Sequence, residues 1–240
     1  MITGLVVLIF IGLLVGVTVF GSFKNVLFSV KEVGAIPFVI FLIIIQFFLL
    51  INIQSFVPAS QVDKYRTAIM SYMILTIFFV GFTEKKDMFR GENLPFFSDT
   101  LVKGVTKFLF GFLVIWVVFG AFMNPSHVSG DKIGSEFIFF TLVVAVSEEL
   151  IFRYGLPRYL YVFMRGNNVT SPKGVESGTA MVLSNVFFAI FHSTVYHFDP
   201  SSIMYAFIAG LLLYAVASKF GIEYSMGAHA SYNLIVGGVI

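Results

Sequence analysis

Long apolar runs separated by short polar connectors extend through the whole chain. A helix needs about 20 apolar residues to cross a bilayer. That length predicts spans at roughly 2–21, 35–57, 67–83, 101–123, 136–156, 178–197, 201–218 and 222–240. The first run lacks a basic start and a small-residue cleavage site, so we interpret it as a span and not as a signal peptide. The pattern therefore predicts an all-α fold, a polytopic transmembrane helical bundle of about eight spans.

The composition agrees with a protein of the membrane. Of the 240 residues, 58% are hydrophobic and 12% are charged, and the mean hydropathy is +0.94. These values exclude an ordinary soluble domain, and a net charge of +2 is too small to suggest nucleic-acid binding. The absence of cysteine excludes disulfides, a thiolate nucleophile and cysteine-ligated metal. We expect one integral membrane domain in contact with lipid, with N-terminal helices in residues 1–125 and a helical core in residues 136–240.

The basic residues of the connectors predict an orientation in the cell membrane. The loops after even-numbered spans hold Lys64, Arg66 and Lys132. Those after odd-numbered spans hold Lys24, Lys31, Lys85, Lys86, Arg90, Lys103, Lys107, Arg158, Arg165, Lys173 and Lys219. By the positive-inside rule, the odd loops are cytoplasmic and both termini lie outside. The fifth span then runs inward, which puts Glu148 nearer the cytoplasmic side.

A charged cluster of Glu148, Glu149 and Arg153 lies at the end of the fifth apolar run. Ionisable groups in a span cost roughly 2.5–3.5 kcal/mol each, and they usually face a bundle interior or a wet cavity and mark function. Neighbouring helical residues point about 100° apart, so the two glutamates are expected to face different directions. Glu149 and Arg153 are four residues apart and share a face. The spacing predicts a self-neutralising Glu149–Arg153 pair, with Glu148 left free for chemistry.

Four other polar residues lie deep in apolar sequence, Asn185 and His192 in the sixth span and His229 and Asn233 in the eighth. Each pair recurs at helical spacing and so occupies one stripe of its helix. Asn185 is the expected helix-to-helix hydrogen-bonding residue of this set. If the stripes meet the fifth span, they enclose a polar intramembrane cavity with a carboxylate, two imidazoles and an amide. These groups are suited to activating water and stabilising an oxyanion.

Three motifs at these positions resemble a known family. They are Glu-Glu-x-x-x-Arg at residues 148–153, Phe-x-x-x-His at residues 188–192 and His-x-x-x-Asn at residues 229–233. In this respect the chain resembles the type II CAAX prenyl endopeptidases and bacteriocin-processing proteins, called the CPBP or Abi family. The resemblance covers roughly residue 136 to the C-terminus. One departure is Tyr154, where the family often has glycine.

The resemblance implies an intramembrane endopeptidase of the glutamate type. Glu148 and His192 would then hold and deprotonate the attacking water, while His229 and Asn233 would donate hydrogen bonds to the tetrahedral oxyanion. Glu149 and Arg153 would be structural support. The implied substrate is a membrane-associated peptide, such as a prenylated protein with a CAAX-type C-terminal extension. Because members of the family are described as working without a metal, no cofactor is expected.

Two alternatives remain open at this stage. Glu148, His192 and His229 could bind Zn²⁺ with water in the fourth position, although the helical His-Glu-x-x-His pattern of many zinc enzymes is missing. The chain could also be a non-catalytic membrane scaffold or a partner-binding subunit, or a proton relay in transport, with the polar set holding helices together. That role predicts that Glu148→Gln preserves function, whereas the protease predicts that Glu148→Ala abolishes it.

Overall fold

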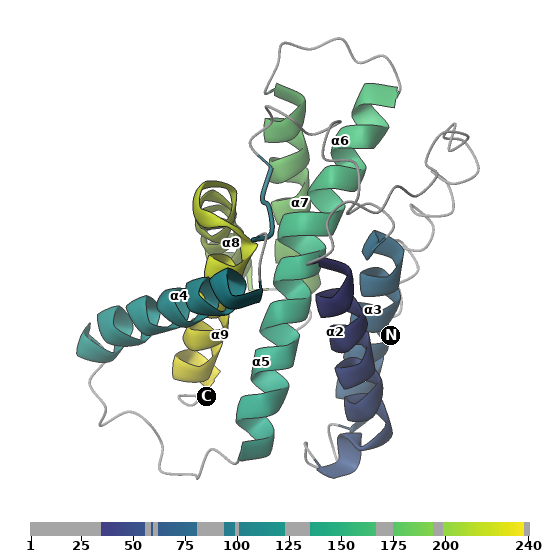
Figure 1. The fold of residues 1–240 in the computed structure, drawn as a ribbon, viewed down its shortest axis with the longest axis vertical. Coiled ribbons are helices and arrows are strands. Elements are labelled where there is room, and N and C mark those ends of the chain that lie inside the picture. Colours follow the sequence, from purple (N-terminus) through teal and green to yellow (C-terminus); the bar gives the residue numbers. More distant parts are fainter. Residues whose placement is uncertain are drawn as a thin grey trace.

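A computed structural model describes residues 35–55, 59, 62–80, 94–98, 101–122, 135–166, 175–193 and 199–237. All regular structure in these ranges is helical (Figure 1). The elements are α2 (Ala35–Ile51), η2 (Ile53–Ser55), α3 (Val62–Val80), α4 (Leu101–Phe122), α5 (Ser135–Glu149), η6 (Leu150–Gly155), α6 (Leu156–Gly166), α7 (Val175–Ser193), α8 (Pro200–Phe220) and α9 (Ile222–Gly237). The all-α prediction is confirmed for this part of the chain, and the predicted span at 2–21 lies outside it.

The central element is a continuous rod formed by α5, η6 and α6 (Figure 1). Its middle segment η6 is a π-helix in which all six residues are buried, and the N–H of Leu156 donates to the carbonyl of Ile151. Pro157 follows in the next turn and has no N–H to donate to a carbonyl one turn back. The wider π turn therefore lies where regular α-helical hydrogen bonding is already interrupted. The sequence had predicted that this span ends near residue 156, but the rod continues to Gly166.

Helix α7 returns along α6 and forms a hairpin with it (Figure 1). Glu148 lies 18 residues before the end of the rod at Gly166, and His192 lies 17 residues after the start of α7 at Val175. The two arms have nearly equal numbers of residues, and their α-helical parts rise by about 1.5 Å per residue. The two arms of the hairpin therefore bring Glu148 and His192 to almost the same level.

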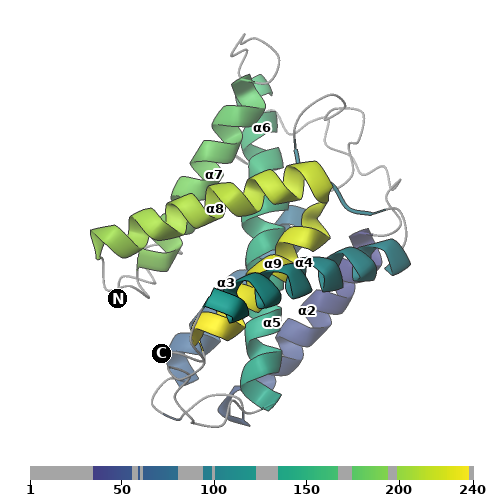
Figure 2. The same ribbon diagram turned by 90° about the vertical axis from the view of Figure 1, so that its left-hand side faces the viewer.

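The other helices pack around this hairpin. Helices α2 and α3 contact the α5 part of the rod, and α8 crosses it next to α7 and α9 (Figure 2). Helix α4 crosses α9 very closely, because a Cβ on Gly111 would lie 2.3 Å from the carbonyl oxygen of Tyr224 and one on Gly227 would lie 2.0 Å from that of Phe108. Gly221, with a φ of 107°, turns the chain from α8 into α9. The glycines thus hold α9 in the position from which His229 reaches the rod.

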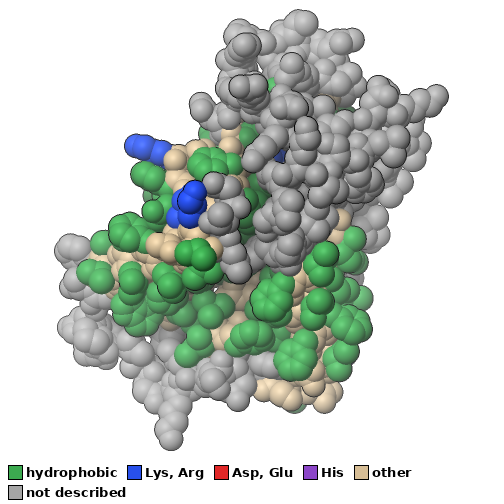
Figure 3. Space-filling model, in the orientation of Figure 1, with side chains coloured by type: hydrophobic (Ala, Val, Ile, Leu, Met, Phe, Trp, Pro, Cys, Tyr) green, Lys and Arg blue, Asp and Glu red, His purple; other side chains and the backbone are tan. Residues whose placement is uncertain are grey.

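Large hydrophobic side chains are exposed on α2 and α4 (Figure 3). They are Ile40, Phe41, Ile44, Phe47, Phe48 and Ile51 on α2, and Val102, Val105, Leu109, Phe110, Leu113, Val114, Trp116, Val117 and Val118 on α4. By length and composition, α8 is the one described helix that is apolar enough to cross a membrane. The count of eight spans and the polar cavity remain predictions.

The structure corrects one part of the charge pattern. Arg158 was counted as a loop residue, but it lies in α6 and is 5% exposed. Its guanidinium donates to the carbonyl oxygens of Tyr154, at 3.1 Å, and of Pro95, and it stacks 3.6 Å from the centre of the Tyr154 ring. Arg158 therefore does not belong to the loop charges, and the orientation in the membrane stays a prediction.

Candidate active site

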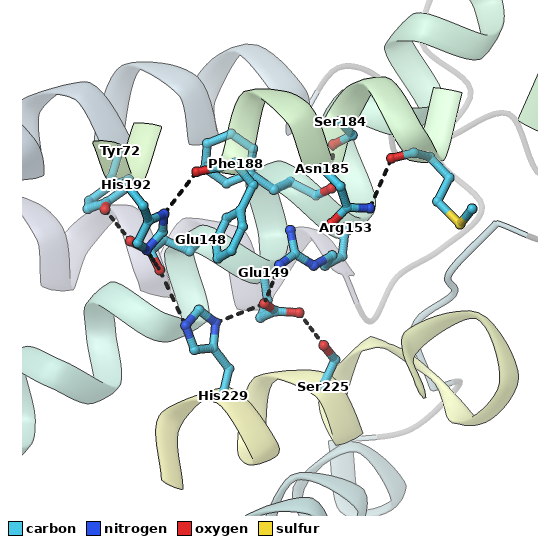
Figure 4. A network of polar contacts seen from close by, with 12 residues as sticks. Tyr72, Glu148, Glu149, Arg153, Ser184, Asn185, Phe188, His192, Ser225 and His229 are labelled. Atoms are coloured by element: carbon cyan, nitrogen blue, oxygen red, sulfur yellow. Dashed lines mark hydrogen bonds and ion pairs between the residues drawn. The ribbon is translucent and has the colours of Figure 1, made fainter. Parts of the chain in front are cut away.

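The predicted residues Glu148, His192 and His229 come together in the middle of the molecule (Figure 4). Glu148 extends from the last turn of α5, His192 from α7 and His229 from α9. The Oε2 atom of Glu148 lies 3.7 Å from Nε2 of His192 and 3.5 Å from Nε2 of His229. Glu148 is 3% exposed and His229 is 4% exposed. Three helices distant in the sequence thus direct one carboxylate and two imidazoles at the same point.

The hydrogen bonds of the two imidazoles define which nitrogens carry protons. The Nδ1 atom of His192 lies 2.9 Å from the carbonyl oxygen of Phe188, which can only accept, so Nδ1 donates. The Nδ1 atom of His229 lies 2.8 Å from Oε1 of Glu149, which accepts when the carboxyl group is ionised. In the neutral form of either ring, Nε2 is then the nitrogen with a free lone pair. Both Nε2 atoms are the ones that face Glu148.

The carboxylate of Glu149 is surrounded by hydrogen-bond donors and a positive charge. In addition to His229, its carboxylate accepts a hydrogen bond from the hydroxyl of Ser225, and its Oε1 lies 3.6 Å from Nη2 of Arg153. The side chains of Glu149 and Arg153 are both 0% exposed. The predicted pair between them is therefore present, but it is one part of a larger buried network (Figure 4).

His229 contacts both glutamates, which the sequence had assigned to separate directions. Its Nε2 faces Glu148 and its Nδ1 faces Glu149. The two carboxylates do diverge around the end of α5, but an imidazole presents nitrogens on two sides and can lie between them. The two glutamates thus face different directions, as expected, and one imidazole contacts both of them.

Arg153 packs between α7 and α8 beside the glutamates. Its guanidinium lies 4.1 Å from the centre of the Phe188 ring. A Cβ on Gly210 of α8 would lie 2.4 Å from Oδ1 of Asn185 and 3.3 Å from Nη2 of Arg153. Asn185 itself donates to the carbonyl of Met181, at 2.9 Å within its own helix. Glycine at position 210 is thus what lets α8 approach this charged group.

Tyr72 is a site residue that the sequence reasoning missed. It lies on α3, and its hydroxyl donates a hydrogen bond to Oε1 of Glu148. The ring is 5% exposed and lies 5.5 Å from the ring of Phe191, measured between centroids. The chain has ten tyrosines, and no short motif distinguishes this one. Ser225 was missed as well, although it precedes His229 by one helical turn.

Asn233 is the predicted residue that the described contacts do not join to the cluster. It lies on α9 one turn after His229 and is partly buried. No hydrogen bond of its side chain is found among the described residues. Its position on the same helical face as His229 agrees with the predicted spacing, while its role stays a prediction.

The Zn²⁺ alternative places Glu148, His192 and His229 around one ion. In the described ranges, no group of three or more histidine, cysteine, aspartate and glutamate side chains is arranged to hold a metal ion. Metal dependence stays a prediction, which the chelator experiment described below addresses.

Fold and site together define an all-helical protein with a buried carboxylate–histidine centre assembled from four helices. The model of the family described as type II CAAX prenyl endopeptidase Rce1-like matches residues 131–235. This match confirms the resemblance that the three motifs predicted, and it covers α5 to the greater part of α9. No curated protein and no solved structure matches the chain.

Proposed function

We propose that the protein is an intramembrane endopeptidase that hydrolyses a peptide bond with a water molecule activated by Glu148 and His192. The observation that carries this proposal is the buried Oε2 of Glu148, which faces Nε2 of His192 at 3.7 Å and Nε2 of His229 at 3.5 Å. This oxygen makes no hydrogen bond with the described residues. It retains the lone pairs that a general base needs.

In the proposed reaction, Glu148 takes a proton from water while the resulting hydroxide attacks the carbonyl carbon of the substrate. The C–O bond forms as the carbonyl π bond becomes an oxyanion. The C–N bond then breaks, and the leaving nitrogen takes the proton back from Glu148. His192 accepts a hydrogen bond at Nε2 from the second O–H of the water, because its Nδ1–H donates to the carbonyl of Phe188. A base placed in this way contributes roughly 10²–10⁴-fold to the rate.

We assign the stabilisation of the oxyanion to His229 and Asn233. His229 can donate from Nε2 only when both ring nitrogens are protonated. In the network around His229, the charged groups are the carboxylates of Glu148 and Glu149 and the guanidinium of Arg153. A proton on His229 would balance these charges, and Glu149 lies at 2.8 Å to stabilise it. This balance supports His229 as the donor in the proposed step.

The family description supports a substrate of the prenylated CAAX type, or another membrane-associated peptide. The exposed apolar faces of α2 and α4 and the apolar helix α8 support an integral, multi-pass protein in contact with lipid. The reaction as proposed needs no metal. We further propose that the site opens nearer the cytoplasmic side, as the distribution of basic loops predicts.

The test is cleavage of a prenylated reporter peptide by the purified full-length protein in detergent, with and without a strong chelator. We expect cleavage that the chelator leaves unchanged and that Glu148→Ala abolishes. The variant should still purify as a monodisperse species.

Full activity in Glu148→Ala would overturn the proposed mechanism. Loss of cleavage on chelation would replace it with the metal-dependent reaction. If the reporter and a panel of membrane peptides all stay intact, the non-catalytic scaffold becomes the better interpretation.

A further inference from the structure

We propose that Tyr72 is a positioning residue for Glu148, so that α3 from the N-terminal half of the chain completes the active site. This inference rests on the proposed function. It concerns a residue outside the family match at 131–235 and outside the three motifs. The site would therefore depend on a helix that the resemblance does not cover.

The first observation is that the two oxygens of Glu148 contact different residues. Oε1 accepts the hydrogen bond from the hydroxyl of Tyr72, whereas Oε2 faces the two imidazoles. A carboxylate free to rotate would exchange its oxygens between these environments. The bond to Tyr72 fixes its plane and keeps Oε2 directed at His192 and His229, as a second donor does for many catalytic groups.

The second observation is that the tyrosine ring is itself held in place. Tyr72 belongs to a buried hydrophobic cluster with Ile151 and Phe152 of η6 and Phe188 of α7. Its ring also lies against that of Phe191, with 5.5 Å between centroids. The hydroxyl is thus positioned by rings from two of the elements that carry the motifs, η6 and α7.

The third observation is a buried polar contact that holds α3 in register with α5. Gln46 of α2 donates from Nε2 to the hydroxyl of Ser147, at 2.8 Å, and to that of Thr76, at 3.4 Å. Ser147 directly precedes Glu148, and Thr76 follows Tyr72 by one helical turn. Gln46 is 1% exposed. One amide therefore joins the neighbours of both partners, and a slip of α3 along α5 would break this contact together with the Tyr72–Glu148 bond.

The kinetic test compares Tyr72→Phe with Tyr159→Phe in the full-length protein, with the prenylated reporter as substrate. Both changes remove one hydroxyl from the same hydrophobic cluster, but Tyr159 lies on α6, about three helical turns beyond Glu148 along the rod. We expect Tyr72→Phe to lower kcat about 10–100-fold with KM within about twofold. Tyr159→Phe should keep wild-type kcat and KM. Wild-type kcat in Tyr72→Phe, or an equal loss in both variants, would overturn the proposal.

A second measurement is independent of activity. Melting temperatures of Tyr72→Phe, Glu148→Ala and the double variant form a cycle that reports coupling between the two side chains. We expect the double variant to melt at a higher temperature than the sum of the single shifts predicts. If the shifts in melting temperature are additive, the two side chains are not coupled and the proposal is overturned, even if the enzyme is active. An inactive wild type would overturn the proposed function, and with it the catalytic purpose of Tyr72, while the cycle would still report the contact.

Discussion

The two glutamates on either side of the His229 ring differ in how many hydrogen-bond partners their oxygens have. On the Nδ1 side, Glu149 contacts His229, Ser225 and Arg153, and its side chain is 0% exposed. On the Nε2 side, Glu148 is held by Tyr72 through one oxygen, while the other oxygen has no hydrogen bond with the described residues. Two consecutive residues of α5 thus differ in their pairing: both oxygens of Glu149 have polar partners, whereas one oxygen of Glu148 has no hydrogen bond in the part of the chain that the structure describes.

This contrast separates a structural carboxylate from a chemical one. A buried charge that is fully paired contributes order to the site but has no lone pair to offer a substrate. A buried oxygen that faces two basic nitrogens at 3.5 and 3.7 Å is suited to exchange a proton with a molecule placed among them. Glu149 should therefore matter chiefly for folding, and Glu148 chiefly for turnover.

The largest expected effect follows from Glu148→Gln. The amide has nearly the shape of the carboxylate and its oxygen can still accept from Tyr72, but it cannot take a proton from water. We expect cleavage of the reporter to fall about 10²–10⁴-fold, with a free energy of unfolding within about 1 kcal/mol of wild type. Steady-state kinetics and chemical unfolding of the same preparation measure the two quantities. Retained cleavage in Glu148→Gln would contradict the role of Glu148 as the base that takes a proton from water.

The next largest effect is expected for Glu149→Gln, this time on stability. The substitution leaves the guanidinium of Arg153 buried without its counter-ion, and breaking such a pair costs about 3–5 kcal/mol. Chemical unfolding in detergent should show this loss. The matched variant Glu149→Gln with Arg153→Met removes both charges and should recover part of it. Equal stability of wild type and Glu149→Gln would contradict the structural role.

A smaller effect is expected where α8 approaches the buried arginine. Gly210→Ala would place a Cβ 2.4 Å from Oδ1 of Asn185, and such overpacking costs about 1–3 kcal/mol. Gly178→Ala is the control, because a Cβ there meets nothing within 4 Å. Helix propensity predicts that this control is neutral or stabilising by up to about 1 kcal/mol. The difference in unfolding free energy between the two variants measures the contact.

The parts of the site that follow from short-range spacing could be predicted from the sequence. Glu149 and Arg153 are four residues apart, so a helix brings them to one face whatever surrounds it. Glu148, His192 and His229 all lie deep in apolar runs. Their meeting could be predicted because an ionisable side chain within a membrane span needs a polar partner. The all-helical fold followed from the apolar runs in the same way.

The missed features depend on contacts between distant segments or on details of backbone hydrogen bonding. Tyr72 meets Glu148 only because α3 packs against the rod, and a tyrosine in an apolar helix looks the same whether its hydroxyl faces lipid or a carboxylate. The π-helix from Leu150 to Gly155 arises from a shift in backbone donors, which the pattern of side chains does not record. The sharing of His229 by both glutamates requires knowing that α9 approaches between them.

The hairpin of α6 and α7 has a consequence for how the chain can change in length. Its two arms, 18 residues from Glu148 to Gly166 and 17 residues from Val175 to His192, bring base and imidazole to one level. Four residues added to one arm would displace His192 by about 6 Å along the helix, and one added residue would turn it about 100° away. Equal additions to both arms would leave the meeting point intact. Insertions and deletions in the two arms are therefore tolerable only in matched pairs.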